Sequence, residues 1–386
     1  MVMRLESFHT ALGLWVSSME DYIKVERQKM SADIDVLSPL VSVVIPLHNA
    51  ERHLDETLES ISAQSLKYFE AIMVDDGSTD STAEIAARFS GKDKRFKLIR
   101  QENRGAAVAR NKGMELARGR YLIFLDADDL FESSMLASMS AALEGSGADV
   151  CVCDSIGFDS NSGKPIESFR TLGDIEGGCH ETRQLLKALF QVFEGVPWDK
   201  MYRRSFVLAN GYGFQNLKKS NDNFFTFANL ANSEKIYVLR EKYVRYRCNA
   251  GGSIQDGTGS NNLCILRAAD ALYKVGVPEA ARDSLATWSF SGYLRAFELS
   301  AAVSETLAHE VYACYKKDYE AEWGMRSRKP SSMILWQVKV RFWCERRLSF
   351  EGLFRAYSPR GDKRYESRCE KVIRLLRMFF LAVIKA

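Results

Sequence analysis

Three acidic residues follow a run of aromatic and aliphatic residues in the stretch Tyr121 to Asp129. Such a run is typical of a strand buried on both faces, and it ends on Asp126, Asp128 and Asp129. Two carboxylates one residue apart at a strand end can hold a hard divalent cation, because oxygen ligands suit Mg and Mn. A bound cation can in turn neutralise a diphosphate. The motif alone is weak evidence, since Asp33-Ile34-Asp35 has the same spacing without such a strand.

A second acidic pair, Asp75-Asp76, ends the apolar run Phe69 to Val74. In a nucleotide-binding sheet, one carboxylate can accept hydrogen bonds from a base or ribose while another holds the metal. Ligands bind at the carboxyl edge of open α/β sheets, so two strands that end in acids predict a nucleotide site there. Each pair taken alone is also compatible with a helix N-cap.

Strand and helix patterns alternate from Val41 onward and supply the sheet that these acids require. Strands are predicted at 41–46, 69–74, 96–99, 121–125 and 150–153. The segment Ser81-x-x-Glu84 has the form of a capping box and predicts a helix that runs through Phe89. Strands separated by helices predict right-handed βαβ units and a mainly parallel α/β sheet. The alternation is lost over 156–256, where one helix is predicted near Glu181 to Phe193, and further helices are predicted at 263–275 and 279–303.

The order and spacing of these motifs resemble those of the family 2 glycosyltransferases with the GT-A fold, which are inverting enzymes that use nucleotide-diphosphate sugars. The matching residues are Val41 to Asn49 with Glu51, Gln64-Ser65, Val74 to Asp80, Asn103 to Gly105, Ala109 to Gly113 and Gly119 to Asp129. The resemblance implies a Rossmann-like, mainly parallel sheet with flanking helices, followed here by a mostly helical, basic C-terminal region.

The resemblance also implies roles for individual residues. Asp76 would bind the base, with Arg110 close to it. Asp126 would reach the ribose or the metal, and Asp128 would ligate a divalent metal, Mn or Mg, that bridges the diphosphate. His48 stands where the family usually has a tyrosine, which leaves the stacking partner of the base open. The implied donor contacts are Pro46, His48, Asn49, Glu51, Asp76, Arg110, Asp126, Ala127, Trp198, Arg247 and Ser253.

The second half of the chain resembles the acceptor side of the same family. The matches are Trp198 to Arg204, Gly211 to Phe214, Tyr246-Arg247 and Gly252 to Ile254. Asp222 would be the general base that removes a proton from the acceptor hydroxyl. The glutamate that normally precedes this aspartate is replaced by Asn221. Without the first half, Trp198 is most simply a core aromatic and Asp222 a turn residue.

The length of 386 residues accommodates about two domains. The predicted segments are a helical extension over 1–39, a GT-A domain over 40–256 and a helical region over 257–386. The GT-A domain divides into a nucleotide-sugar half, 40–155, and an acceptor half, 156–256.

Composition places the chain among ordinary globular proteins, with 46% hydrophobic and 27% charged residues. Its 8 cysteines are scattered, which favours reduced thiols over a disulfide framework or a zinc site. No signal peptide is recognisable, and no window approaches ~20 uninterrupted apolar residues. These features predict a cytoplasmic protein.

Basic residues gather near the C-terminus, where 16 Lys and Arg face 5 Asp and Glu from Arg326 to the end. In this tail Val372, Leu376 and Phe379 share one face of a predicted helix. A basic amphipathic helix predicts peripheral contact with the inner face of the cell membrane. The alternative is a helix packed on the catalytic body. No nucleic-acid-binding module is recognised, and no nucleic acid partner is expected.

These features together predict an inverting glycosyltransferase of the hexosyltransferase type. The expected donor is a nucleotide-diphospho-sugar, with a UDP-sugar favoured, and the expected acceptor is a hydroxyl of a glycan or lipid-linked saccharide in surface polysaccharide biosynthesis. A nucleotidyltransferase would need a phosphate-binding glycine and lysine loop near the first strand, and Pro46 to Glu51 offers none. A non-catalytic nucleotide-sugar-binding or assembly subunit stays open, because Asn221 and the basic tail are compatible with it.

Overall fold

The computed structural model describes residues 38–166, 169, 171–248, 263–301 and 305–314. Nearly all of them belong to one compact unit that begins at Leu40, and the structural statements below concern these residues. Three expectations fall outside the described residues: nearly all of the N-terminal extension, Ser253, and the basic amphipathic tail.

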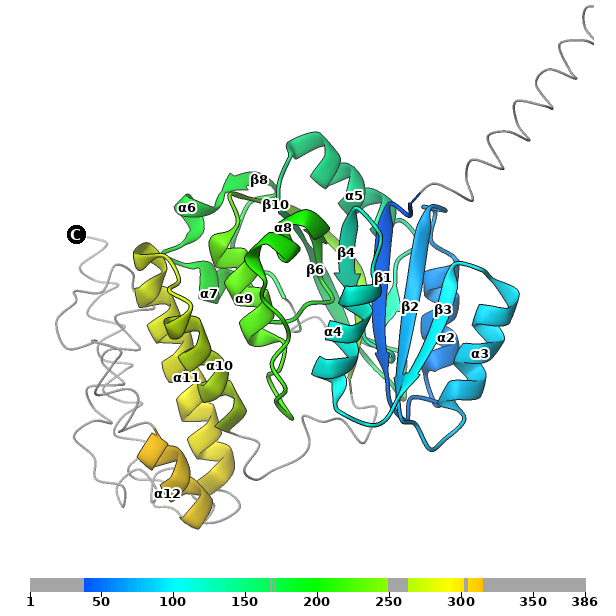
Figure 1. Ribbon diagram of the computed structural model, residues 1–386. Coiled ribbons are helices and arrows are strands. Elements are labelled where there is room, and N and C mark those ends of the chain that lie inside the picture. The colour runs from blue at the N-terminus through cyan, green and yellow to red at the C-terminus, as the bar shows by residue number, and fades with distance from the viewer. Residues whose placement is uncertain (1–37, 167–168, 170, 249–262, 302–304, 315–386) are drawn as a thin grey trace, which may run out of the picture. The chain divides into compact units, whose positions relative to one another are not determined.

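The apolar runs of the first half form parallel strands joined by helices, as predicted (Figure 1). Strand β1 (Val41–Leu47) lies between β2 (Phe69–Asp76) and β4 (Tyr121–Phe124), and β3 (Phe96–Gln101) lies beyond β2. All of these pairings are parallel. The connecting helices are α2 (Leu54–Ser62), α3 (Thr82–Lys92) and α4 (Ala106–Leu116). Every residue of β2 and β4 is buried: β4 is wholly apolar, whereas β2 also buries Glu70 and its terminal acids Asp75 and Asp76.

The second half extends the same sheet, with the order β3-β2-β1-β4-β9-β6-β10-β5. Two long strands, β6 and β10, pair in parallel, while β9 runs antiparallel between β4 and β6. The sheet is therefore mixed, with its long central ladders parallel. The strands are β5 (Leu130–Phe131), β6 (Val150–Asp159), β7 (Pro165–Ile166), β8 (Gly178–Glu181), β9 (Lys200–Arg203) and β10 (Lys235–Cys248).

Side chains of β1 divide the hydrophobic core into two layers, because successive residues of a strand point to opposite faces. Val43 and Ile45 face the layer covered by α2, α3 and α5 (Met135–Ser146). Val44 faces the other layer, which α4 and α9 (Asn223–Asn232) cover. The α/β architecture with helices on both faces agrees with the fold class predicted from the sequence (Figure 1).

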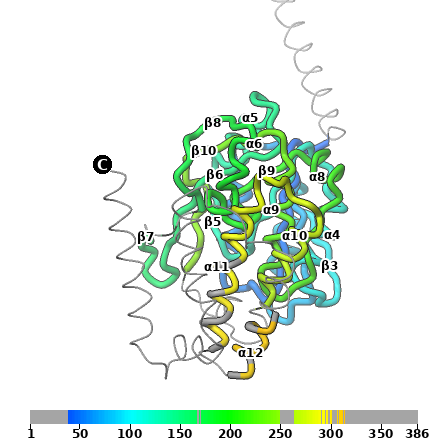
Figure 2. Tube along the Cα trace, turned by 90° about the vertical axis from the view of Figure 1, so that its left-hand side faces the viewer, coloured from blue at the N-terminus to red at the C-terminus, as the bar shows by residue number. Residues whose placement is uncertain are grey.

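Helices follow the sheet toward the C-terminus, as the sequence predicted. Helix α10 (Cys264–Lys274) packs against α9, and α11 (Arg282–Ala301) packs against α7 (Leu189–Val192) and α12 (Glu305–Cys314) (Figures 1 and 2). A short 3₁₀ turn, Glu279–Ala281, precedes α11. These helices thereby pack beside α9 and α7.

The single helix predicted near Glu181 to Phe193 is wrong. Two short helices, α6 (Thr182–Leu185) and α7, occupy this segment. The backbone N–H of Phe190 donates to the hydroxyl of Ser284 on α11 at 3.0 Å instead of to the preceding turn. Contact with α11 therefore replaces a helical hydrogen bond that the local sequence favours.

The capping box at Ser81 and Glu84 marks the start of α3, but its side-chain hydrogen bond is absent from the described helix terminus. The free N–H groups are satisfied by other acids. The N–H of Ser81 donates to Glu51 Oε2 at 2.9 Å, and the N–H of Thr82 donates to Asp80 Oδ1 at 3.0 Å. Long-range capping by Glu51 thus connects α3 to the loop after β1. In the second half, helix α8 (Arg204–Asn210) follows β9 directly.

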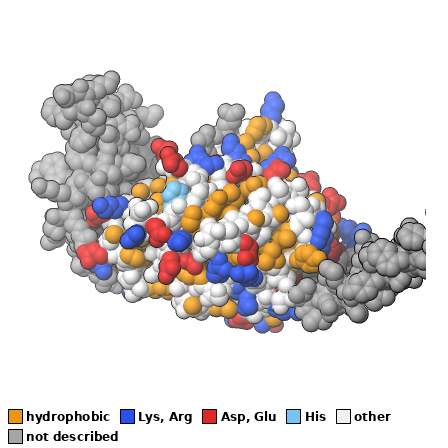
Figure 3. Space-filling model, turned by 90° about the horizontal axis from the view of Figure 1, so that it is seen from above, with side chains coloured by type: hydrophobic (Ala, Val, Ile, Leu, Met, Phe, Trp, Pro, Cys, Tyr) orange, Lys and Arg blue, Asp and Glu red, His pale blue; other side chains and the backbone are white. Residues whose placement is uncertain are grey.

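Among the helices that the structure describes, none has the length and apolar character that a membrane crossing requires. The face drawn in Figure 3 carries basic and acidic side chains interspersed with apolar ones. The concentration of basic residues seen in the sequence belongs to the tail, which lies outside the described residues.

Candidate active site

The acids singled out in the sequence meet at the carboxyl edge of β1, β2 and β4. Strand β2 carries Asp75 and Asp76 as its last residues, whereas β4 ends at Phe124. Leu125 continues the edge by donating its N–H to Val44 O at 3.0 Å, and Asp126 follows it. The loop Leu125 to Asp129, hereafter the acid loop, therefore begins beside the end of β1.

Asp76 is buried, and its carboxylate holds the loop before α4. Its oxygens accept the N–H groups of Arg104 and Gly105 at 2.8 and 2.7 Å. The side-chain amide of Gln101 donates to it at 2.7 Å. Gly105 has φ +95°, a backbone conformation that residues other than glycine rarely adopt. Glycine at this position therefore allows the loop to direct its N–H toward the Asp76 carboxylate. Asp76 consequently fixes the backbone around the site in addition to any contact with a base.

The loop after β1 is tied to the loop after β2. Asn49 adopts φ +49°, where asparagine is better tolerated than most residues, and its Oδ1 accepts the N–H of Thr79 at 2.9 Å. The ring of His48 is exposed and donates from Nδ1 to Asp76 O at 3.0 Å. Pro46 lies within β1 opposite Val74. Of the predicted donor residues in this loop, His48 thus contacts Asp76, whereas Asn49 and Glu51 bond to the loop after β2.

Arg110 connects the two halves of the site. Its Nη2 donates to Asp126 Oδ1 at 2.6 Å, and its Nη1 donates to Asn221 Oδ1 at 2.9 Å. The guanidinium also lies over the ring of Phe214, 5.5 Å from its centroid. Arg110 is 7% exposed, so these contacts form in a largely dehydrated environment where charge-assisted hydrogen bonds are strong.

Asp222 follows Asn221 and immediately precedes α9. An aspartate at this position usually caps the helix, but the Asp222 side chain makes no capping hydrogen bond. Burial raises the pKa of this carboxyl; Arg110 opposes the increase and the Asp126 charge adds to it. The group therefore lies near Arg110 and Asp126 and makes no helix-capping hydrogen bond.

Asp128 projects from the acid loop and is solvent-exposed on one side. Loss of hydration on its protein side and the charge of Asp126 raise its pKa to about 6. A divalent cation would relieve this repulsion, so the pair Asp126 and Asp128 fits a hard metal ion. Within the described part of the chain, no cluster of three or more His, Cys, Asp or Glu could hold an ion. A metal here would complete its ligand set with substrate phosphate and water.

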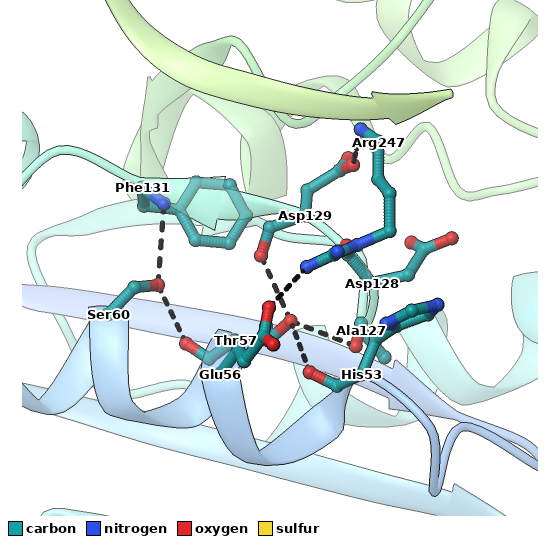
Figure 4. Close-up of polar contacts among 9 residues, drawn as sticks. All are labelled: His53, Glu56, Thr57, Ser60, Ala127, Asp128, Asp129, Phe131 and Arg247. Atoms are coloured by element: carbon teal, nitrogen blue, oxygen red, sulfur yellow. Dashed lines mark hydrogen bonds and ion pairs between the residues drawn. The ribbon is translucent and has the colours of Figure 1, made fainter. Parts of the chain in front are cut away.

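Arg247 lies against the acid loop (Figure 4). Its Nε donates to Asp128 O at 2.7 Å, and its Nη2 pairs with Glu56 Oε2 at 2.8 Å. Its backbone N–H donates to Asp129 Oδ1 at 2.8 Å. Burial raises the pKa of Asp129 well above the ordinary value, and the neighbouring acids add to the increase. Arg247 thus brings positive charge to the acids from the end of β10.

Trp198 is 3% exposed and packs in the core layer that contains Val43 and Ile45 of β1. It stacks on Tyr246 at 5.5 Å between ring centroids, and Tyr246 stacks on Phe169 at 4.6 Å. Next to Trp198, the fully buried side chains of Asp199 and Lys200 form an ion pair of 2.6 Å. Trp198 therefore contributes to the aromatic packing behind Tyr246.

Several residues of this site were not identified from the sequence. Gln101 pairs with Asp76 because the β2–β3 register places them opposite each other. Glu56 and Thr57 lie on α2, where a polar residue within an apolar helix pattern gives no specific signal. Ser253 cannot be placed, since it lies outside the described residues.

Known proteins with similar sequences support this architecture. Residues 42–208 match the family model described as glycosyl transferase family 2. The chain is 31% identical over 224 residues to the putative glycosyltransferase EpsH of Bacillus subtilis, covering 56% of this chain and 63% of EpsH. It is 32% identical over 219 residues to the uncharacterized glycosyltransferase EpsJ of the same organism, covering 55% and 62%. The chain thus spans less than two thirds of the length of these relatives.

A third relative is the putative teichuronic acid biosynthesis glycosyltransferase TuaG of Bacillus subtilis, 39% identical over 128 residues, or 34% of this chain and 52% of TuaG. Among solved structures, S. aureus TarS 1–349 in complex with UDP aligns with a TM-score of 0.53 at 21% identity, covering 79% of this chain and 91% of that one. The complex of the same protein with UDP-GlcNAc aligns with a TM-score of 0.50 at 20% identity, covering 85% and 83%. Residues 42–208 are thus similar to glycosyltransferase family 2, and the fold of the chain is similar to that of the TarS structures.

Proposed function

We propose that the protein is an inverting glycosyltransferase that moves a sugar from a nucleotide-diphosphate sugar to an acceptor hydroxyl. The observation that carries this proposal is the buried bridge from Asp126 through Arg110 to Asn221, with the uncapped carboxyl of Asp222 beside it. The bridge joins the proposed donor-side acid Asp126 to Asn221, which is the chain neighbour of the proposed base Asp222. Direct displacement requires the donor-binding groups and the general base to lie around the same anomeric carbon.

In the proposed reaction, Asp222 accepts the proton of the acceptor hydroxyl while that oxygen bonds to the anomeric carbon. The bond from this carbon to the diphosphate breaks, and the nucleoside diphosphate leaves from the opposite face with inversion. Asp128, with Asp126 beside it, would hold a divalent cation, which would supply positive charge to the leaving diphosphate. Arg247 provides further positive charge near the acid loop.

The donor is proposed to be a UDP-sugar, because the TarS structures that share the fold hold UDP-GlcNAc and UDP. The name of TuaG mentions teichuronic acid biosynthesis, which supports a glycan or lipid-linked acceptor in surface polysaccharide synthesis. The predicted domain boundaries, with a GT-A domain over 40–256, stay predictions. So does the cytoplasmic location.

Peripheral contact with the inner face of the membrane is proposed for the basic tail on sequence grounds alone. The full chain should sediment with liposomes that contain anionic lipid and should be released by high salt. A chain that ends near Arg326 should stay in solution. Equal sedimentation of the two chains refutes the membrane proposal without affecting the proposed reaction.

The test of the reaction is a panel of UDP-, GDP- and TDP-sugars with Mn²⁺, assayed for release of the nucleoside diphosphate and for the anomeric configuration of the product. Asp222→Asn serves as the matched variant, since it keeps the size of the side chain and removes the base. Release by the native protein, together with loss of release in the variant, supports the enzyme. Binding of a nucleotide sugar without turnover supports the non-catalytic subunit instead.

A further inference from the structure

Helix α2 presents polar side chains to the segment that follows β4. Thr57, Ser60 and, just beyond the helix, Gln64 are spaced so that they share one side of the helical path. Thr57 is fully buried, and Gln64 is 1% exposed. Buried polar groups on a helix that otherwise packs through leucine and isoleucine require partners, and each of these residues finds its partners in the backbone of residues 127–136.

Thr57 holds the acid loop on both sides of Asp128 (Figure 4). Its hydroxyl lies 3.0 Å from Ala127 O and 2.9 Å from Asp129 O. The carbonyl between them, Asp128 O, accepts from Arg247 Nε at 2.7 Å. All three successive carbonyls therefore lie within hydrogen-bonding distance of a donor outside the loop, with the Thr57 hydroxyl shared between the first and the third. Arg247 also pairs with Glu56, the neighbour of Thr57 on α2. Both residues that contact these carbonyls are therefore connected to the same turn of α2.

The neighbouring residues continue the attachment. Ser60 Oγ accepts the N–H of Phe131 at 3.3 Å and donates to Thr57 O at 2.7 Å. Gln64 donates to Glu132 O at 2.9 Å and accepts the N–H of Leu136 at 3.0 Å. The segment is thus attached to α2 from the acid loop to the start of α5.

We propose that Thr57 is a positioning residue that sets the direction of the Asp128 carboxylate toward the donor's diphosphate and metal. The acid loop has no strand ladder of its own between β4 and β5, so contacts from outside determine its backbone. The hydroxyl has a single proton for the two loop carbonyls and for His53 O, 3.2 Å away in its own helix. A shared hydrogen bond of this kind is lost completely when the hydroxyl is removed. The inference rests on the proposed function.

The test compares four variants in the full-length protein. Thr57→Val removes the hydroxyl and keeps the branched shape, whereas Thr57→Ser keeps the hydroxyl. Thr57→Ala and Thr57→Ser form a second pair, since both lack the γ-methyl group and differ only in the hydroxyl. Thr287→Val is the matched control, because Thr287 is a buried threonine on α11 whose hydroxyl donates to Asp283 O of its own helix at 2.9 Å.

The measurement is UDP binding by calorimetry as a function of Mn²⁺ concentration, followed by kcat and donor KM at saturating Mn²⁺. Substitution of a group that orients a metal ligand typically lowers metal affinity about 10–100-fold. We expect Thr57→Val to raise the half-saturating Mn²⁺ concentration at least about tenfold, with Thr57→Ser within about threefold of the native protein and Thr287→Val unchanged. If Thr57→Val fails to fold, the same contrast is expected between Thr57→Ala and Thr57→Ser.

Equal Mn²⁺ dependence in the hydroxyl-free variants and the native protein overturns the positioning role while leaving the proposed function intact. Equal weakening in Thr57→Ser and Thr57→Ala also overturns it, because the hydroxyl then has no part in the effect. If the native protein binds none of UDP, GDP and TDP with Mn²⁺, the proposed function fails and the positioning role fails with it.

Discussion

The guanidinium of Arg110 donates from Nη1 to the side-chain oxygen of Asn221 at 2.9 Å, across 111 residues of sequence. The same guanidinium pairs with Asp126 at 2.6 Å. Arg110 therefore has a neutral partner on the acceptor side and a charged partner on the donor side. Asn221 stands where the family that this chain resembles usually has a glutamate, so the partner of Arg110 on this side is uncharged here.

Replacement of Arg110 by methionine should lower both stability and donor binding. The change leaves Asp126 without its cation and Asn221 without its donor. Loss of the paired hydrogen bonds should reduce the free energy of unfolding by about 1–3 kcal/mol, measured by urea denaturation. Arg120→Met is the control, because Arg120 and its partner Glu144 are 58% and 39% exposed and the change should alter stability by less than about 1 kcal/mol. Equal effects in the two variants would contradict a special role for Arg110.

Substitution of Asn221 by aspartate should move the acid limb of the kcat/KM profile to higher pH. A second carboxylate would compete with Asp126 for Arg110 and add negative charge next to Asp222. Both effects disfavour the ionised form of Asp222, which is the form that acts as base. Asn221→Ala removes the hydrogen bond without adding charge and serves as the comparison. An unchanged acid limb in Asn221→Asp, with normal folding, would show that Arg110 does not couple the two residues.

Asp222→Asn should suppress sugar transfer by about 10²–10⁴-fold while leaving UDP binding nearly unchanged. Burial raises the pKa of Asp222, so the ionised carboxyl is less favourable in the folded than in the unfolded protein. At neutral pH the native aspartate is therefore destabilising, and this destabilisation disappears as the pH falls below the ordinary aspartate value of about 3.9. The asparagine variant should accordingly have the higher Tm at pH 7 and an equal Tm near pH 3. A lower Tm for the variant at pH 7 would contradict the sign of the shift.

The buried ion pair of Asp199 and Lys200 should contribute to the stability of the fold. Both side chains are 0% exposed, and Lys200 also donates to the carbonyls of Glu194 and Val196 at 2.9 Å. Lys200→Met leaves a buried carboxylate without its cation, which typically costs about 3–5 kcal/mol of unfolding free energy. The exposed lysine of the pair Lys274 and Asp270 provides the control, with an expected loss below about 1 kcal/mol for Lys274→Met.

Asp199 is the next acid to test as the general base, and substitution of Asp199 tests this alternative. Asp199→Asn should alter unfolding in urea but leave transfer by the remaining folded protein close to the native rate. The complete burial of Asp199 keeps its carboxyl away from an acceptor hydroxyl. Loss of transfer in folded Asp199→Asn protein, with Asp222→Asn still active, would assign the base to Asp199 instead.

The fold and part of the site were predictable because their signals are local. The strands before Asp76 and Asp126 are buried on both faces, and their apolar runs, interrupted in β2 by Glu70, are recognisable in the sequence. Strand β10 was missed because Arg240 to Lys242 are exposed and interrupt its alternation where the register with β6 shifts. The contact of Arg110 with Asn221 depends on how two distant segments pack, and no local pattern specifies it.

The contacts that support the acid loop could not be predicted from a local sequence pattern either. Thr57 resembles any polar residue in an amphipathic helix, and its function in the structure depends on carbonyls 70 and 72 residues away in sequence. Backbone carbonyls carry no residue identity, so a hydrogen bond to them leaves no mark on the sequence of the loop. Residues that hold backbone are therefore harder to predict than residues that present carboxylates.

Metal-dependent UDP binding should weaken in acid because Asp128 must be ionised to ligate a cation. Burial and the Asp126 charge raise its pKa to about 6. Above that value the carboxylate is mostly ionised, and below it the half-saturating Mn²⁺ concentration should rise about tenfold per pH unit. Calorimetric titrations with UDP between pH 5 and 7.5 measure this dependence. Asp128→Asn should bind Mn²⁺ weakly at every pH, whereas Glu115→Gln, an exposed acid near the far end of α4, should follow the native curve. A native curve that stays flat down to pH 5, or full transfer activity in excess chelator, would exclude Asp128 as the metal ligand.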